Sequence, residues 1–148
     1  YRGPIVYAAN HGEEFETIRF WDALDYIGID NYYPLDDQYS AAALVAKIET
    51  VQQRFQKPVL FTEAGFGAHQ NSHREPWEDE SKKALDLDEQ ARSYEALLGA
   101  VYRKPWFRGV YWWKVGTNGY GGPENNSMTP WRKPAMEVIK RHYLLPRR

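Results

Sequence analysis

The sequence predicts an α/β fold in which parallel strands alternate with helices. Four apolar segments of strand length are separated by segments whose apolar residues recur at helical spacing, which is the pattern of βαβ units. The strand candidates are nearly continuous apolar runs, as expected for parallel strands with both faces covered. All four finish in polar or aromatic residues, and parallel α/β folds gather functional groups at the carboxyl ends of their strands. We therefore expect one structural unit over residues 1–148, with one functional edge.

The first two strand candidates lie within the first 34 residues. Residues 5–10 form a short apolar run that ends in Asn10, and residues 26–34 form a second run that ends in a polar and aromatic cluster. Pro34 closes the second run, because proline has no N–H to donate to a strand ladder. Between the two runs, a polar loop leads to a short helical or irregular segment at residues 20–24.

A helix is predicted over residues 40–56 and the third strand over residues 59–63. Ser40 suits the N-cap position, because its hydroxyl can accept a hydrogen bond from an N–H of the first turn. The apolar residues that recur at helical spacing are Leu44, Ile48, Val51 and Phe55. Pro58 ends the helix, and the strand that follows ends in Glu63.

The third helix follows a long polar stretch, residues 67–85. Asp86 and Glu89 have the spacing of a capping box, with Asp86 at the N-cap and Glu89 three positions later. We expect the helix to run to about Arg103, since Pro105 cannot continue it.

The fourth strand is predicted over residues 109–115, and a loop rich in Gly and Asn covers residues 116–127. The last helix starts near Pro134, a residue type favoured in the first helical turn. The residues expected along or beside its buried face are Met136, Ile139, Lys140 and Tyr143.

Composition and charge argue against several classes of protein. Nineteen basic and twenty acidic residues give a formal charge of -1, without the basic excess of nucleic-acid binders. No apolar run approaches the ~20 residues of a membrane span, so no membrane partner is expected. The absence of cysteine excludes disulfides and cysteine zinc sites. No glycine-rich phosphate loop follows a strand, and we expect no cofactor.

Three histidines in the predicted loops match no metal-binding spacing. His11, His69 and His73 are therefore expected to be solvated, and no metal site is predicted. The first residues, 1–4, lack the charged and apolar regions of a signal peptide. Because the lack of cysteine suits the cytosol without excluding secretion, localisation stays open between the two.

The carboxylate at the end of the third strand is the candidate catalytic group. Strict alternation would place Val59, Phe61 and Glu63 on one face, which in a barrel would be the interior. A carboxylate at the top of that face suits a nucleophile or a general base. Gly65 would let the backbone turn sharply after the strand. The alternative is a structural Glu63 that caps the next loop or pairs with an arginine.

The end of the second strand carries further candidates. Asp30 and Tyr32 share a face by alternation, and a Tyr32 hydroxyl that donates to Glu63 would hold that carboxylate ionised and oriented. The alternative is that Tyr32 and Tyr33 are core aromatics and that Asp30 caps the next turn.

The aromatic content is high, at 16% with six Trp and eleven Tyr. A core rich in aromatics would explain it, and so would a site that stacks on sugar rings. Trp112 and Trp113 must point to opposite faces, so we expect Trp113 to face the ligand and Trp112 to pack against helices. Trp77 lies in a charged loop, where an exposed indole often lines a binding cleft.

Several segments, in order, resemble the C-terminal half of a retaining TIM-barrel glycoside hydrolase. These segments are DYIGIDNYYPL at 25–35, PVLFTEAGF at 58–66, DEQA at 88–91, GVYWW at 109–113 and MTPWRKPA at 128–135. The group that they resemble most is glycoside hydrolase family 113, the β-mannanase-like family.

The resemblance implies a fold and a set of site residues. The fold would be the C-terminal half of a (β/α)8 TIM barrel, with the four strands as strands five to eight. Glu63 would be the catalytic nucleophile on strand seven. The residues that it implies around the sugar are Asn10, Asp30, Tyr32 and the strand-eight pair Trp112 and Trp113, while Tyr33 and Trp77 complete the predicted binding set.

The same resemblance raises a mechanistic problem. Retaining hydrolysis needs two carboxyl groups, and in this clan the acid/base residue ends strand four, which would precede the chain. Glu13 and Glu14 follow the first strand in a loop and are not expected to replace it. We therefore expect little or no activity from the chain alone.

Three functions remain open from the sequence: a glycosidase or part of one, a carbohydrate-binding module without hydrolytic activity, and a structural α/β domain. In the first two, the ligand is an oligo- or polysaccharide whose sugar is not specified. A half barrel would leave open sheet edges and an uncovered face, so self-association or pairing with an N-terminal half-barrel is expected.

Overall fold

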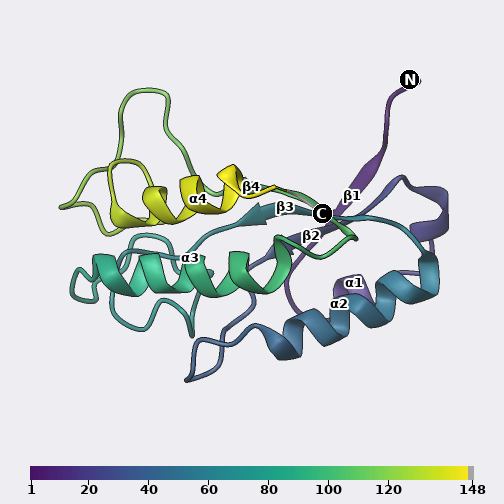
Figure 1. Cartoon of the computed structure of the whole chain (residues 1–148), viewed down its shortest axis with the longest axis horizontal. Coiled ribbons are helices and arrows are strands. Elements are labelled where there is room, and N and C mark those ends of the chain that lie inside the picture. Colours follow the sequence, from purple (N-terminus) through teal and green to yellow (C-terminus); the bar gives the residue numbers. More distant parts are fainter. Residues whose placement is uncertain (147–148) are drawn as a thin grey trace.

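The computed structural model describes residues 1–146 and has an α/β architecture (Figure 1). In chain order its elements are β1 (Val6–Ala9), α1 (Glu14–Thr17), the 3-10 turn η1 (Trp21–Ala23), β2 (Tyr26–Asn31), α2 (Ala42–Phe55), β3 (Val59–Ala64), α3 (Leu87–Val101), β4 (Phe107–Trp112) and α4 (Pro134–Leu144). The four strands form one sheet in the order β1-β2-β3-β4, and every neighbouring pair is parallel. The predicted alternation of parallel strands and helices is confirmed.

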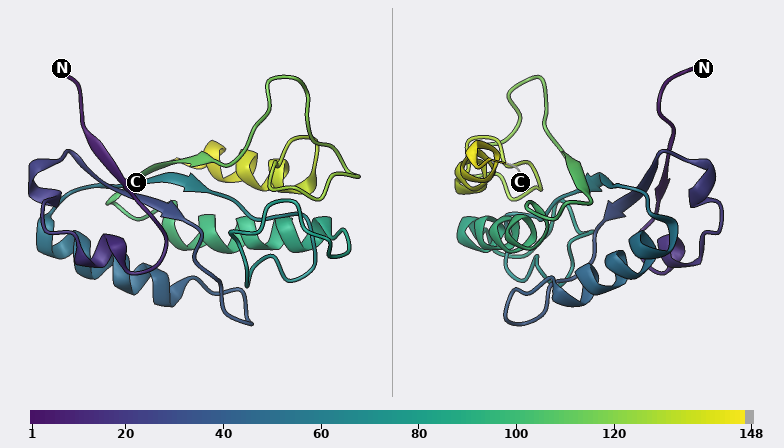
Figure 2. Two further views of the ribbon diagram at one scale, coloured as in Figure 1. Left: turned by 180° about the vertical axis from the view of Figure 1, so that it is seen from behind. Right: turned by 45° about the vertical axis from the view of Figure 1, so that its right-hand side comes forward.

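The helices cover one face of this sheet, and α3 packs against α4 (Figures 1 and 2). The covered face holds the core, in which Ile27 and Ile29 of β2 and Val59 and Phe61 of β3 are buried with helix residues. Leu60 and Thr62, which alternate with them, are only partly buried. Each strand therefore has a covered side and a more open side.

The expectation that both faces of every strand are covered is wrong, most clearly at the edges of the sheet. In β1, three of four residues are exposed, including Val6 and Tyr7, and Tyr111 of β4 is also exposed. An apolar run suits a strand that is covered on both faces, but within residues 1–146 the helices cover one face of this sheet, and β1 and β4 lie at its ends.

Helix boundaries follow the local signals with small differences. The Asp86 side chain accepts a hydrogen bond from the Glu89 N–H at 2.9 Å, which confirms Asp86 as the N-cap of α3. The Glu89 side chain does not complete a capping box, because it is bonded to other groups described below. Ser40 lies one residue before the N-cap of α2, and its Oγ accepts from Ala42 N–H at 3.1 Å.

Other boundaries were not predicted. Helix α1 lies in the stretch expected to be a polar loop, and β4 begins two residues earlier and ends three residues earlier than expected. On α4, Lys140 and Tyr143 are exposed. Its buried residues are Ala135, Val138, Ile139 and His142. Within residues 1–146, no helix combines the length and apolar character needed to cross a membrane.

Candidate active site

A register shift in β3 decides where Glu63 lies. Ile29 pairs with Phe61, but the next residue, Asp30, pairs with Glu63, so Thr62 is an extra residue in the ladder. Such a bulge reverses the side-chain alternation beyond it. Phe61 is therefore buried in the helix-covered core, whereas Thr62 and Glu63 are both partly exposed. The prediction that Glu63 shares a face with Val59 and Phe61 is wrong.

The ends of β2 and β3 are joined by two side-chain hydrogen bonds. The Tyr32 hydroxyl donates to Glu63 Oε2 at 2.8 Å, as the sequence predicted. The Thr62 hydroxyl donates to Asp30 Oδ1 at 2.7 Å. Burial, followed by the bond to Glu63, raises the pKa of Tyr32, so its hydroxyl remains a donor at neutral pH. Glu63 thus has a tyrosine as its partner rather than the arginine expected of a structural ion pair.

Gly65 brings the ends of β3 and β4 together. A β-carbon at this position would lie only 2.3 Å from the Trp113 carbonyl oxygen, and the Trp113 N–H donates to the Ala64 oxygen at 2.8 Å. The φ of Gly65 does not lie in the left-handed region. Its role is close approach between backbones, and the predicted sharp turn is corrected accordingly.

The two tryptophans at the end of β4 point in different directions. Trp112 lies 4.6 Å from the Tyr94 ring between centroids, and its Nε1 donates to the Tyr143 hydroxyl at 3.0 Å. It therefore packs against α3 and α4, as alternation predicted. Trp113 is exposed beside the end of β3, and its peptide bond to Lys114 is cis. Trp113 is therefore the more exposed of the two indoles at this strand end.

An aromatic row, formed by Tyr32, His11 and Trp77, extends from Glu63. The His11 ring lies 6.1 Å from Tyr32 in an edge-on arrangement and 5.9 Å from Trp77 with the two planes within 5°. These residues come from three different loops that follow β1, β2 and β3. The sequence identified Tyr32 and Trp77, but no local signal identified His11, since only the fold brings it between them.

The remaining predicted binding residues have different surroundings. Asn10 is exposed at the end of β1, where its Oδ1 accepts from the His11 N–H. Tyr33 does not reach Glu63: its hydroxyl donates to the Gly12 carbonyl at 2.7 Å, and its ring meets Phe15 edge-on. The contacts of Tyr33 are therefore packing contacts on the side of α1, away from Glu63.

The loop that carries Trp77 is anchored by two buried histidines, His69 and His73, which both precede the indole in the sequence. His73 donates its backbone N–H to Glu89 Oε1 and places Nδ1 2.5 Å from the same oxygen. Tyr39 also donates to the Glu89 carboxylate. His69 is fully buried, with Nε2 3.1 Å from the Glu78 carbonyl oxygen. The expectation that His69 and His73 are solvated is wrong, because the loop folds back onto the start of α3.

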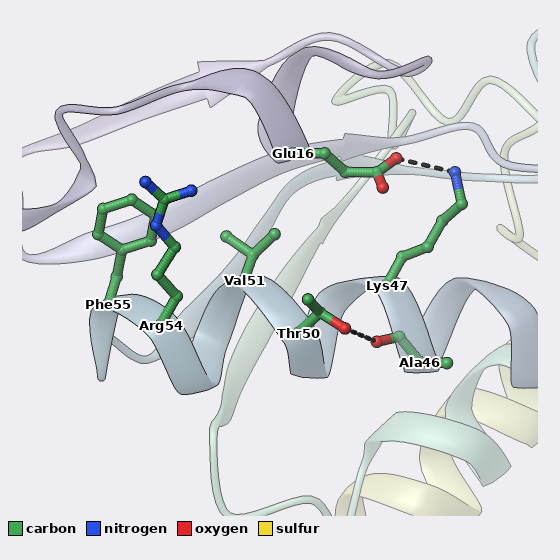
Figure 3. A pocket seen from close by; sticks show the side chains of 7 residues that line it. All are labelled: Glu16, Ala46, Lys47, Thr50, Val51, Arg54 and Phe55. Atoms are coloured by element: carbon green, nitrogen blue, oxygen red, sulfur yellow. Dashed lines mark hydrogen bonds and ion pairs between the residues drawn. The ribbon is translucent and has the colours of Figure 1, made fainter.

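A hollow lies between α1 and α2, away from these strand ends (Figure 3). Its charged groups already have partners: Lys47 pairs with Glu16 at 2.8 Å, and the Arg54 guanidinium lies over the Phe55 ring. It has no group poised for chemistry. Across residues 1–146, the acidic and histidine side chains also form no cluster suited to a metal ion.

Comparison with known proteins decides which family this site belongs to. The family model for Glycoside Hydrolase Family 113 matches residues 1–130. The chain belongs to glycoside hydrolase family 113. The predicted resemblance to this β-mannanase-like family is therefore confirmed.

Solved structures of family 113 agree. The GH113 β-mannanase AaManA from Alicyclobacillus acidocaldarius, in complex with ManMIm, is 36% identical over 97% of this chain, with a TM-score of 0.85. A GH113 β-1,4-mannanase complex is 30% identical over 99% of this chain, with a TM-score of 0.88. This chain spans 45% and 47% of those chains. It therefore corresponds to about half of a family 113 TIM-barrel chain.

More distant structures share the fold alone. A β-glucuronidase from Bifidobacterium dentium is 20% identical over 97% of this chain, with a TM-score of 0.63, and the match spans 24% of that chain. A search of curated proteins found no match.

Proposed function

We propose that this chain supplies the nucleophile side of a retaining glycosidase site that acts on β-mannan or a related β-linked polysaccharide. It would be the C-terminal half of the barrel, with β1 to β4 as strands five to eight. The observation that carries the proposal is the Tyr32 hydrogen bond to Glu63 at a bulged strand end. A partly exposed, oriented carboxylate is what attack on an anomeric carbon requires.

The proton donor would come from outside this chain. Retaining enzymes place their two carboxyl groups about 5–5.5 Å apart, and the second must be able to protonate the leaving group. Asp30 lies opposite Glu63 but accepts a hydrogen bond from Thr62. Glu14 accepts from the Asn10 N–H and from the Tyr7 hydroxyl, which hold its pKa below the usual value. Neither carboxyl group is suited to be the acid.

The alternative is a carbohydrate-binding module without hydrolysis. Trp77 and Trp113 are both exposed and could stack on sugar rings whether or not Glu63 reacts. The two proposals differ only in whether Glu63 forms a bond with the sugar, so covalent capture separates them.

An activated substrate tests Glu63 without needing the acid. In 2,4-dinitrophenyl β-mannoside, Glu63 would attack the anomeric carbon, the glycosidic C–O bond would break and dinitrophenolate would leave as an anion without protonation. We expect about one equivalent of dinitrophenolate per chain and a mannosyl group on Glu63 by peptide mass spectrometry. Glu63→Gln should give neither. Binding of manno-oligosaccharide without labelling would instead support the binding module.

Adjacent tyrosines provide a matched pair for the same assay. Tyr32→Phe removes the donor to Glu63, so labelling should slow by about tenfold, the effect of one lost hydrogen bond to a charged group. Tyr33→Phe removes a hydroxyl bonded to Gly12 and should leave the labelling rate unchanged. Equal rates in both variants would mean that Tyr32 does not orient the nucleophile.

A further inference from the structure

The exposed face of Trp77 lines a hollow separate from Glu63. Its volume is about 500 Å³, and its lining residues are Asn71, Arg74, Glu75, Trp77 and Lys83, all from the loop between β3 and α3. The indole is 49% exposed. A flat apolar ring surrounded by amide, guanidinium, carboxylate and ammonium groups offers stacking together with both donors and acceptors.

The charges of this hollow favour a neutral ligand. Lys83 is paired with Glu75 and, at 2.9 Å, with Glu78, while Arg74 is paired with Asp37 at 2.8 Å. Each cation thus already has a carboxylate, and an incoming anion would gain little. The Asn71 side chain is exposed and makes no hydrogen bond within the part of the chain that the structure describes. Hydroxyl groups are the ligand chemistry that fits these partners.

The hollow is also rigidly built. The Gln70 N–H donates to the Ala84 oxygen at 3.0 Å, which closes the loop near its base. The two buried histidines described above lie just before the segment that carries Trp77 and bond it to Glu78 and Glu89, and Pro76 beside the indole is buried. A binding surface held in place in this way loses little conformational entropy when a ligand arrives.

The aromatic row links this hollow to the nucleophile. Centroid steps of 6.1 Å and 5.9 Å, from Tyr32 to His11 and from His11 to Trp77, are comparable to the length of one sugar unit. A chain of linked pyranose rings that reaches Glu63 could therefore continue along the row to Trp77.

We propose that the Trp77 hollow is a distal subsite for a neutral hexopyranose unit of the polysaccharide whose glycosidic bond lies at Glu63. In this subsite the sugar ring stacks on Trp77, and its hydroxyls bond Asn71, Arg74 and Glu75. The inference rests on the proposed function for the identity of the chain, but the subsite itself depends only on binding. Such a subsite makes the affinity for an oligosaccharide depend on the number of its sugar units.

The test is calorimetric titration of the full chain with β-1,4-manno-oligosaccharides of two to six units. In the wild type, affinity should rise with length. Trp77→Ala should lower the affinity for the six-unit ligand about five- to tenfold, the effect of losing one aromatic stacking contact, and should leave the two-unit ligand unaffected. Asn71→Ala should lower the affinity for the six-unit ligand by a smaller factor, because it removes one hydrogen bond.

Trp131→Ala is the matched control. Trp131 is 41% exposed and lines a groove beside the start of α4 instead. The Trp131→Ala variant should bind oligosaccharides of every length with wild-type affinity. Circular dichroism would verify the fold of each variant. Affinity that does not depend on length, an equal loss in both tryptophan variants, or tighter binding of anionic mannuronate oligomers would overturn the subsite.

Covalent labelling separates this inference from the proposed function. Labelling of Glu63 uses a single sugar ring and is measured on the wild type, so it reports on the nucleophile without reference to the Trp77 hollow. Length-dependent binding lost in Trp77→Ala, without any labelling of the wild type, would retain the subsite and reject Glu63 as the nucleophile. Labelling of the wild type, together with binding that does not depend on oligosaccharide length, would support Glu63 as the nucleophile and reject the subsite.

Discussion

At the scale of single residues, Lys133 is a buried lysine whose burial disfavours the charged form of its side chain. Its ammonium donates to the Ser127 carbonyl at 2.7 Å and to Asn125 Oδ1 at 3.3 Å, both neutral partners. Desolvation lowers the pKa of Lys133 to about 8, and the attraction of Asp79 offsets this only in part. The group was not singled out in the sequence, because its burial arises from a loop that folds over it.

This shifted pKa predicts a pH-dependent stability. The folded-state pKa lies below the unfolded value, so the folded state binds fewer protons between pH 8 and 10.5 and stability rises with pH in that window. Relative to Lys133→Met, the wild type should gain on the order of 1–3 kcal/mol in free energy of unfolding from pH 7.5 to 10.5. Urea unfolding of both proteins at each pH measures this, and a difference that stays constant would contradict it.

At the scale of elements, the ends of β3 and β4 are joined because the backbone at Gly65 lies close to the backbone at Trp113. Gly65 has no room for a side chain against the Trp113 carbonyl, and Trp113 is itself exposed. Helix α3 contains a contrasting glycine, Gly99, where a β-carbon would meet nothing within 4 Å.

The two glycines predict opposite effects of the same substitution. Gly65→Ala should lower the free energy of unfolding by about 1–3 kcal/mol, because a well-packed region must shift to admit the methyl group. Gly99→Ala should raise it by about 0.5–1 kcal/mol, because alanine loses less backbone entropy in a helix. Chemical denaturation measures both changes. A neutral Gly65→Ala would mean that the strand ends are not tightly joined.

At the scale of the whole molecule, the sheet has two strands with an unpaired side. Strands β1 and β4 lie at its ends, and the exposed apolar residues along them include Val6, Tyr7 and Tyr111. Exposed edges and apolar side chains favour pairing with another sheet. The family 113 structures that this chain matches are about twice as long, so in them a comparable sheet has further chain around it.

The open edges predict that the chain associates with itself. Sedimentation velocity should show a weight-average sedimentation coefficient that rises with concentration. Tyr111→Lys should reduce this rise, because a charge on an edge strand opposes pairing. Leu144→Lys changes an exposed apolar residue at the end of α4 and is the control that should behave as the wild type. A monomer at every concentration in the wild type would contradict the prediction.

Local patterns were enough to place most elements and the main chemical groups. The strands and the helices α2, α3 and α4 follow from apolar periodicity, and Asp86 from its capping position. Opposite directions for Trp112 and Trp113 follow from alternation, because that rule holds for neighbouring residues in an extended chain. The hydrogen bond from Tyr32 to Glu63 was also foreseen, since the carboxyl ends of adjacent parallel strands meet.

Features that depend on segments far apart in the sequence could not be foreseen. The bulge at Thr62 exists only in the pairing of β3 with β2, and it reverses the face of Glu63 that perfect alternation predicted. His11 joins Tyr32 to Trp77 because three loops converge, and His73 is buried because its loop meets α3. Register and burial depend on which partner a segment meets, and a single stretch of sequence carries no record of that partner.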